Sequence, residues 1–367
     1  MKVMENIESQ ITGLKGTDIG LHLISPYVGK IRPVLARHLI KTYAKPKAIV
    51  YDPFCGSGTV PLEAWACGNK CFATDLNDYA ITLTKGKLTP YKSLDEVLER
   101  LDRINSCLNK DKSRKESRGV PQWVSSFFHP KTLSEVLKWT SYLKERKEWF
   151  LLSCLLGILH HQRPGFLSFP SSHGAPYLRN SKYPEDMFPE LYEYREVYSR
   201  LRAKVTRAYK NFPSLDFRIQ RVVRRASSEN ASPPENRIHT IVTSPPYMKS
   251  LTYARDNRLR LWFLGKPDWQ LLEKRISPTR TFFSKLIAAS FIRWSNYQKN
   301  GDYCIIIIGD IPFNKNMRLP EFVVTQAERT GYGMADLLKD PIPDKKRFNK
   351  LKSQISSESI LVFERRE

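Results

Sequence analysis

Long apolar runs are missing from this 367-residue sequence. No stretch approaches the roughly 18 consecutive apolar residues that a membrane-spanning helix needs. The opening segment, MKVMENIESQITGLKG, also lacks the apolar core of a secretory signal. We therefore expect a cytoplasmic protein with no membrane partner.

Cysteine is scarce and follows no pattern. The sequence holds 6 cysteines and no CxxC pair, which predicts free thiols in a reducing compartment and argues against a structural zinc. The neighbouring histidines His160, His161 and His173 have no carboxylates at metal-ligand spacing. We predict no metal site.

Acidic residues are outnumbered. Lys and Arg total 60 against 37 Asp and Glu, which gives a formal net charge of +23. Such an excess favours a polyanionic partner, because basic side chains that neutralise phosphates release counterions. A basic surface without a specific partner is the alternative.

A nucleotide-binding pattern begins near residue 48. The apolar run AIVYDP predicts a buried strand, FCGSG a glycine loop, TVPLEAWACG a helix, and KCFATDL a second strand that contains Asp75 near its end. Glycines let a backbone approach a ligand closely, and an acid in this place commonly accepts hydrogen bonds from ribose hydroxyls. The third glycine of the dinucleotide fingerprint is absent, since Pro61 takes its place, which disfavours NAD.

A second motif, Thr243-Ser244-Pro245-Pro246-Tyr247, follows the apolar segment HTIV. Two prolines remove two N–H donors, so this strand end presents carbonyl and hydroxyl acceptors that suit an amino group. The tyrosine offers a face on which a planar base can stack. A tight turn with a packing tyrosine is the alternative interpretation.

Taken together, DPFCGSGT and TSPPY resemble the motifs of the amino-group (N4-cytosine and N6-adenine) DNA methyltransferase family. SPYVGK, at 25–30, is similar to the family's helix-entry motif, and the segments VVTQAERTGYG and ESILVFERR resemble its last helix and strand. The serine that heads TSPPY resembles the cytosine-N4 branch. The resemblance covers 20–90 and 217–367.

This resemblance implies an α/β, Rossmann-like S-adenosylmethionine-dependent methyltransferase fold, with a mostly parallel seven-stranded sheet and a helical insertion. We expect 20–91 and 217–367 to form the two halves of the methyltransferase domain. The mostly helical 92–216 would recognise the DNA target.

The resemblance also implies site residues. Those expected to be catalytic are Ser244, Pro245, Pro246 and Tyr247. Those expected to bind the cofactor, S-adenosylmethionine, are Tyr27, Gly29, Lys30, Asp52, Pro53, Phe54, Cys55, Gly56, Ser57, Gly58, Thr59, Asp75 and Asn77. Cys55 is expected to be a packing residue and not a nucleophile.

Four arginines are candidates for contacts with DNA phosphates. Arg195 and Arg202 belong to a basic helix predicted over 190–211, and Arg255 and Arg258 follow the TSPPY motif. A solvated helix face is the alternative for each pair. The family often has an acid after its third strand that contacts the cofactor adenine, and VVRRASSEN, at 222–230, offers none at the expected position, so we leave that contact unassigned.

The predicted function is methyl transfer from S-adenosylmethionine to N4 of cytosine in double-stranded DNA, as the modification enzyme of a restriction–modification system. The partners would be duplex DNA and a restriction endonuclease that acts on the same site. Three alternatives stay open: adenine-N6 methylation of DNA, methylation of an RNA base amine, and a non-catalytic nucleic-acid-binding protein with this fold.

Overall fold

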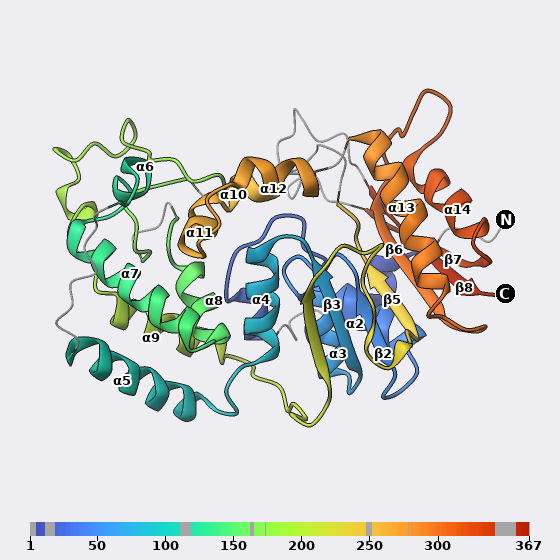
Figure 1. The fold of residues 1–367 in the computed structure, drawn as a ribbon, viewed down its shortest axis with the longest axis horizontal. Coiled ribbons are helices and arrows are strands. Elements are labelled where there is room, and N and C mark those ends of the chain that lie inside the picture. The colour runs from blue at the N-terminus through green and yellow to red at the C-terminus, as the bar shows by residue number, and fades with distance from the viewer. Residues whose placement is uncertain are drawn as a thin grey trace.

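The computed structural model describes residues 5–11, 19–110, 119–161, 165–172, 174–246, 252–277, 279–341 and 357–366. Within these ranges one sheet dominates one half of the molecule and a group of helices the other (Figure 1). The strands of the sheet are β1 (Glu5–Asn6), β2 (Ile49–Asp52), β3 (Lys70–Asp75), β4 (Arg221–Arg225), β5 (Thr240–Thr243), β6 (Tyr303–Gly309), β7 (Tyr332–Pro341) and β8 (Ser357–Arg365).

The described strands form one eight-stranded sheet in the order β1-β7-β8-β6-β5-β2-β3-β4. Strand β8 is antiparallel to β6 and β7, and the remaining pairs are parallel. This is the mostly parallel, Rossmann-like methyltransferase fold that the sequence predicts, and the two-residue β1 adds an eighth strand at one edge. The four consecutive isoleucines of β6 are buried, as expected for a central strand covered on both faces.

Helices cover both faces of the sheet. One hydrophobic core includes residues of α1 (Ile7–Ile11), α2 (Pro33–Tyr43), α3 (Thr59–Ala66) and α4 (Asp78–Leu88). The other core includes residues of α13 (Arg280–Ser295) and α14 (Leu319–Glu328). Two apolar layers therefore hold the sheet between them.

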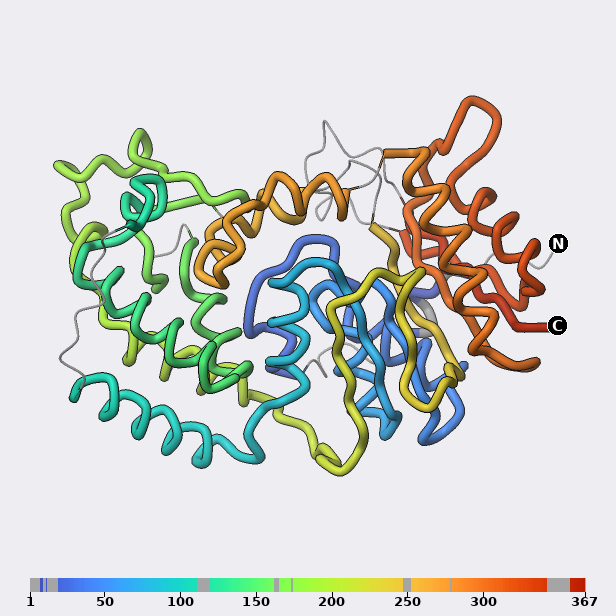
Figure 2. Tube along the Cα trace, viewed as in Figure 1, coloured from blue at the N-terminus to red at the C-terminus, as the bar shows by residue number. Residues whose placement is uncertain are grey.

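The chain between β3 and β4 is mostly helical. After α4 it forms α5 (Leu94–Lys110), α6 (Gln122–Ser125), α7 (Pro130–Glu145), α8 (Trp149–Gly157), a short 3-10 turn at Pro189–Leu191, and α9 (Val197–Ala208). Further 3-10 turns lie at Gly20–Leu23, before α2, and at Pro234–Asn236, between β4 and β5. The predicted basic helix over 190–211 is thus shorter and begins later, because Pro189–Leu191 forms a separate turn. Figure 2 shows this group on the side of the molecule away from α13 and α14.

Three short helices connect the half of the molecule that contains the sheet, the sheet part, to the half that contains the helical group, the helical part. They are α10 (Tyr253–Asp256), α11 (Arg258–Phe263) and α12 (Trp269–Ile276), and they run above α4 and the edge of the sheet (Figure 1). Within the part of the chain that the structure describes, no helix is both long and apolar enough to span a bilayer. All 6 cysteines are free thiols, as predicted.

Candidate functional site

The glycine loop that follows β2 has the backbone geometry that its glycines permit. Gly56 has a φ of +46° and Gly58 a φ of +72°, a region that L residues with side chains rarely adopt. A Cβ atom at Gly56 would lie 3.1 Å from the Tyr27 ring, and one at Gly58 would lie 2.7 Å from the Thr84 hydroxyl oxygen. The loop therefore packs closely against Tyr27 and Thr84. The backbone at Gly56 also borders a pocket.

Asp75 lies at the end of β3, beside this loop. Its carboxylate accepts hydrogen bonds from the backbone N–H of Gly56 at 2.9 Å and of Asn77 at 2.8 Å. Burial raises the pKa of Asp75 to about 6 despite these bonds. Asn77 caps α4 by accepting a hydrogen bond from the Tyr79 N–H. The acid is thus fixed in place, and each oxygen keeps a lone pair for a ligand hydroxyl.

The serine–proline motif begins where β5 ends. Strands β2 and β5 are parallel neighbours, so their carboxyl ends meet at one edge of the sheet. The Thr243 hydroxyl donates to the Asp52 carboxylate at 2.7 Å, which joins the two strand ends directly. Burial raises the pKa of Asp52 to about 7. Asp52 is therefore placed to hold the two loops together.

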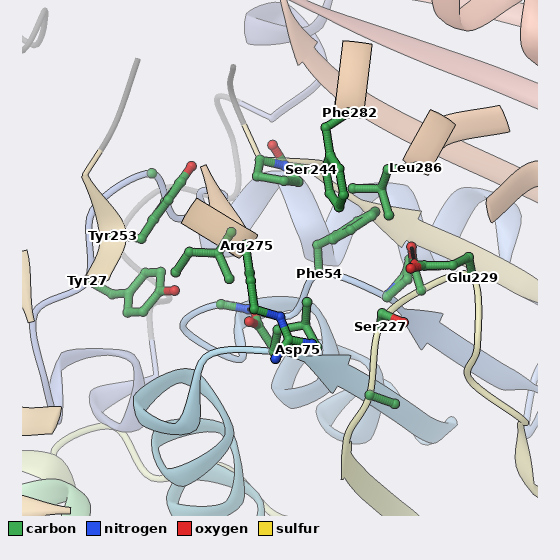
Figure 3. A pocket seen from close by; sticks show the side chains of 18 residues that line it. Tyr27, Phe54, Asp75, Ser227, Glu229, Ser244, Tyr253, Arg275, Phe282 and Leu286 are labelled. Atoms are coloured by element: carbon green, nitrogen blue, oxygen red, sulfur yellow. Dashed lines mark hydrogen bonds between the residues drawn. The ribbon is translucent and has the colours of Figure 1, made fainter. Parts of the chain in front are cut away.

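Both loops open into one pocket with about 710 Å³ of space, including its open mouth. Figure 3 shows Ser244 above, Asp75 below and Phe54 between them. The lining residues are Tyr27, Gly29, Pro53, Phe54, Gly56, Asp75, Leu76, Ala226, Ser227, Ser228, Glu229, Ser244, Pro246, Tyr253, Arg275, Ile276, Phe282 and Leu286.

The predicted catalytic residues fall into three groups. Ser244 and Pro246 line the pocket, and Pro245 is buried behind them. Tyr247 lies outside the described residues. The structure thus brings the head of the motif to the same pocket as the glycine loop.

The predicted cofactor residues divide into lining and supporting positions. Tyr27, Gly29, Pro53, Phe54, Gly56 and Asp75 line the pocket. Asp52, Cys55, Ser57, Gly58, Thr59 and Asn77 do not line it but build the strand ends and the loop. Lys30 is exposed and does not line the pocket.

Three supporting side chains have clear roles. Cys55 is buried beside Thr84, and burial raises the pKa of its thiol well above the ordinary value, which suits a packing residue and not a nucleophile. The Ser57 and Thr59 hydroxyls lie 2.9 Å apart at the start of α3. Both contacts stabilise the loop from within.

Tyr27 forms one wall with two other tyrosines. Its ring stacks on Tyr79 at a centroid distance of 6.0 Å and on Tyr253 at 6.3 Å. Burial and the nearby Asp75 raise the pKa of Tyr27 well above the ordinary value, so its hydroxyl keeps its proton. The N-terminal segment and α10 therefore meet at this side of the pocket.

Several residues that line the pocket were not predicted from the sequence. Glu229 lies in the loop after β4 and lines the pocket, although we identified no acid at the expected position there. The acid follows the strand end by several residues, because 226–230 forms a loop before β5. Tyr253, Arg275, Ile276, Phe282 and Leu286 belong to no motif in the sequence and come from α10, α12 and α13.

Arg195 is not placed to contact DNA. Its side chain is 5% exposed and donates hydrogen bonds to the backbone carbonyl oxygens of Phe166, Ser168 and Leu191. Desolvation lowers its pKa to about 10. The predicted phosphate contact is wrong for this arginine, because its guanidinium connects buried backbone segments.

The other three arginines remain nearer the surface. Arg202 is 42% exposed and pairs with Asp102 at 2.9 Å, and Arg255 is 51% exposed. Arg258 is partly buried, donates to the Pro176 carbonyl and lies over the Trp123 ring. Contacts of these residues with DNA stay predictions.

Among the described residues no group of three or more His, Cys, Asp or Glu side chains could hold a metal ion.

The part of the chain that matches a known protein family forms the glycine-loop side of this site. Residues 29–86 match the family model N6_N4_Mtase, described as DNA methylase. The matched segment contains the glycine loop and Asp75. The predicted resemblance to the DNA methylases is thus confirmed over this segment, and the match does not resolve the cytosine-N4 branch.

A curated relative is the type II methyltransferase M.MjaII of Methanocaldococcus jannaschii, which is 30% identical over 106 residues. The alignment covers 28% of this chain and 19% of the relative, so the chain matches about a fifth of the relative's length.

Among solved structures, TrmN from Thermus thermophilus has a TM-score of 0.36 at 10% identity, covering 98% of this chain and 53% of its own. A TehB-like SAM-dependent methyltransferase from Corynebacterium glutamicum has a TM-score of 0.34 at 10% identity, covering 92% of this chain and 90% of its own.

Proposed function

We propose that this protein is an S-adenosylmethionine-dependent DNA methyltransferase that methylates an exocyclic base amine, and that the amine is N4 of cytosine in duplex DNA. The observation that carries the proposal is the shared pocket. Ser244 and Pro246, from the end of β5, line the same space as Gly56 and Asp75, from the ends of β2 and β3.

The pocket fits S-adenosylmethionine. Asp75 offers acceptors for ribose hydroxyls, and a Cβ at Gly56 would make a tight contact of 3.1 Å with the Tyr27 ring. Phe54, Phe282 and Leu286 provide apolar surface beside Glu229, which suits a purine ring with an amino group. When bound, the cofactor supplies a methyl group on a positively charged sulfur.

The serine–proline turn would bind the amine that receives the methyl group. This amine is conjugated with the base ring and is therefore a poor nucleophile. The Ser244 hydroxyl oxygen and the Pro245 carbonyl would accept its two hydrogens, which draws the nitrogen toward a tetrahedral geometry and directs its lone pair into the pocket. Catalysis in this scheme is positioning and electrostatic stabilisation.

The base must leave the duplex to reach this turn, because its amine is otherwise paired with the opposite strand. The net charge of +23 supports binding to the phosphate backbone. We propose that the helical insertion over 92–216 reads the target sequence, with Arg202, Arg255 and Arg258 near the phosphates. Tyr247 would stack on the rotated base.

Two features support the finer assignment. A serine heads the proline motif, which resembles the cytosine-N4 branch, and the curated relative is named a type II methyltransferase. We propose that the chain is the modification enzyme of a restriction–modification system, with a restriction endonuclease that cuts the same unmethylated site.

The test is methyl transfer from labelled cofactor to duplex DNA, single-stranded DNA and RNA, followed by hydrolysis and identification of the modified base. We expect N4-methylcytosine from duplex DNA. The variant Ser244→Ala should lower kcat about a hundredfold, because a removed hydrogen-bonding group at the reacting atom typically costs that much. Its affinity for S-adenosylhomocysteine should not change.

Ser227→Ala is the matched control, since Ser227 lines the same pocket near Glu229 and is not part of the proline motif. It should change cofactor affinity at most slightly and leave kcat intact. N6-methyladenine or methylated RNA as product would replace the proposed substrate. Undiminished transfer by Ser244→Ala would contradict the proposed role of the serine–proline turn.

A further inference from the structure

We propose that Arg275 binds the carboxylate of the cofactor's methionyl group and so closes the pocket from the side of α12. The inference rests on the proposed function, since it takes S-adenosylmethionine as the ligand. It adds a cofactor-binding residue from a helix that carries no recognisable motif.

Arg275 is the sole basic residue among the described residues that line the pocket. Figure 3 shows its side chain extending from α12 into the pocket in the direction of Asp75, with Tyr27 to one side. Within the described ranges, it forms no hydrogen bond or ion pair with another residue. A guanidinium inside a pocket and without a protein partner is placed to bind an anion.

The helix that carries Arg275 is held over the pocket by a neighbouring carboxylate. Glu273 accepts hydrogen bonds from the backbone N–H of Ala254 at 2.6 Å and of Arg255 at 2.9 Å. These bonds join α12 to α10, whose Tyr253 stacks on Tyr27. The helix that carries Arg275 is therefore joined, through α10, to the wall that Tyr27 forms.

The layout of the pocket indicates which part of the cofactor lies near Arg275. Asp75 marks the ribose, and the apolar side chains beside Glu229 lie on one side of it, where the adenine fits. The amino-acid part must then extend to the opposite side, toward Tyr27 and within reach of Arg275, which enters the pocket from α12 (Figure 3).

Charge complementarity favours the carboxylate as the group that Arg275 binds. The cofactor's amino-acid part carries one anion, and the pocket wall offers one cation. Lys30, the basic residue of the helix-entry motif, does not line the pocket. A DNA phosphate is the competing ligand for Arg275, since the residue is exposed.

The experiment measures binding by calorimetry with two ligands, S-adenosylhomocysteine and its analogue that lacks the carboxylate. In Arg275→Gln the affinity for S-adenosylhomocysteine should fall about tenfold or more, the usual effect of losing a charge-assisted hydrogen bond. The affinity for the decarboxylated analogue should change less than twofold. Lys274→Gln is the control, because Lys274 is exposed on the same helix and does not line the pocket.

Three outcomes would overturn the inference. Arg275→Gln could leave the affinity for S-adenosylhomocysteine unchanged, it could weaken both ligands equally, or it could weaken DNA binding alone, which would assign Arg275 to a phosphate. Wild-type protein that binds S-adenosylhomocysteine tightly but transfers no methyl group to DNA would contradict the proposed function and leave this binding test valid. Wild-type protein that binds neither ligand would overturn both.

Discussion

The sheet part and the helical part of this molecule place their charged residues for different purposes. In the sheet part, Asp52 and Asp75 stand at the ends of neighbouring parallel strands, where Asp75 lines the pocket and Asp52 joins the two loops beside it. In the helical part, Arg195 is buried and donates to backbone carbonyl oxygens of other segments, and Arg260 of the connecting helix α11 does the same. A position at a strand end therefore predicts a role at the site, whereas a basic helix alone does not predict a binding surface.

The largest effect should come from the sheet part, at the glycine loop. In Gly58→Ala the new Cβ would meet the backbone and hydroxyl of Thr84, and the φ of +72° would be strained. Strain of about 1–2 kcal/mol together with a displaced loop should lower the affinity for S-adenosylhomocysteine about a hundredfold. Calorimetry measures the affinity, and thermal unfolding measures the cost in stability.

Gly68→Ala is the matched control for this substitution. Gly68 follows the other end of α3 with a φ of +83°, and a Cβ there would have no heavy atom within 4 Å. It should cost a similar backbone strain and leave ligand affinity unchanged. Equal losses of affinity in both variants would show that strain near α3, and not the shape of the loop, controls binding.

How much of this architecture the sequence predicts also differs between the two parts. The strands β2, β3, β5 and β8 and the glycine loop are predicted well, because each buried strand is a short apolar run that ends in a turn signal. Strand β7 is missed. Most of its residues are half-buried and its register shifts between Met334 and Asp336, so no alternating pattern appears.

Helix α4 is missed for the opposite reason. It is buried on nearly all sides, with α8 of the insertion packed on it, and yet it contains the polar residues Thr82, Thr84 and Lys87. A helix enclosed in this way has no exposed face, and so the sequence shows no amphipathic period. The pocket wall from α10, α12 and α13 is missed because its residues meet through tertiary packing and share no motif.

The next largest effect is expected in the helical part, at the buried Arg195. Arg195→Ala removes the donors to three backbone carbonyl oxygens, and buried acceptors left without partners should lower the free energy of unfolding by roughly 2–3 kcal/mol. Arg255→Ala, at a position 51% exposed, should leave stability unchanged and weaken DNA binding by a few-fold. Denaturant unfolding and DNA titrations at several salt concentrations measure the two effects. A stable Arg195→Ala protein that binds DNA poorly would reverse the contrast between buried and exposed arginines.

A smaller effect is expected at Phe282, on the pocket side of α13. Its ring is 49% exposed and lies near Phe54 in the pocket (Figure 3). If the adenine stacks there, Phe282→Ala should weaken cofactor binding about fivefold to tenfold, near the lower end of base–aromatic stacking. Ile292→Ala, on the same helix and 56% exposed, does not touch the pocket and should have no effect on affinity. An adenine bound elsewhere would make the two variants indistinguishable in calorimetry.

The smallest effect should come from the titration of Asp75, whose pKa burial raises to about 6. The ionised carboxylate accepts hydrogen bonds from ribose hydroxyls more strongly than the protonated acid does. Affinity for S-adenosylhomocysteine should therefore fall a few-fold as the pH drops through about 6, and Asp75→Asn should bind weakly at every pH.

The free energy of unfolding should change with pH in the opposite direction to the affinity. The native state holds this proton where the unfolded chain, with its ordinary pKa of 3.8, has lost it, so the free energy of unfolding decreases as the pH rises toward 6. Since Asp52 contributes a slope of the same sign up to about pH 7, the quantity to measure is the difference between wild type and Asp75→Asn. Affinity and stability that move together with pH would place the titrating group somewhere other than Asp75.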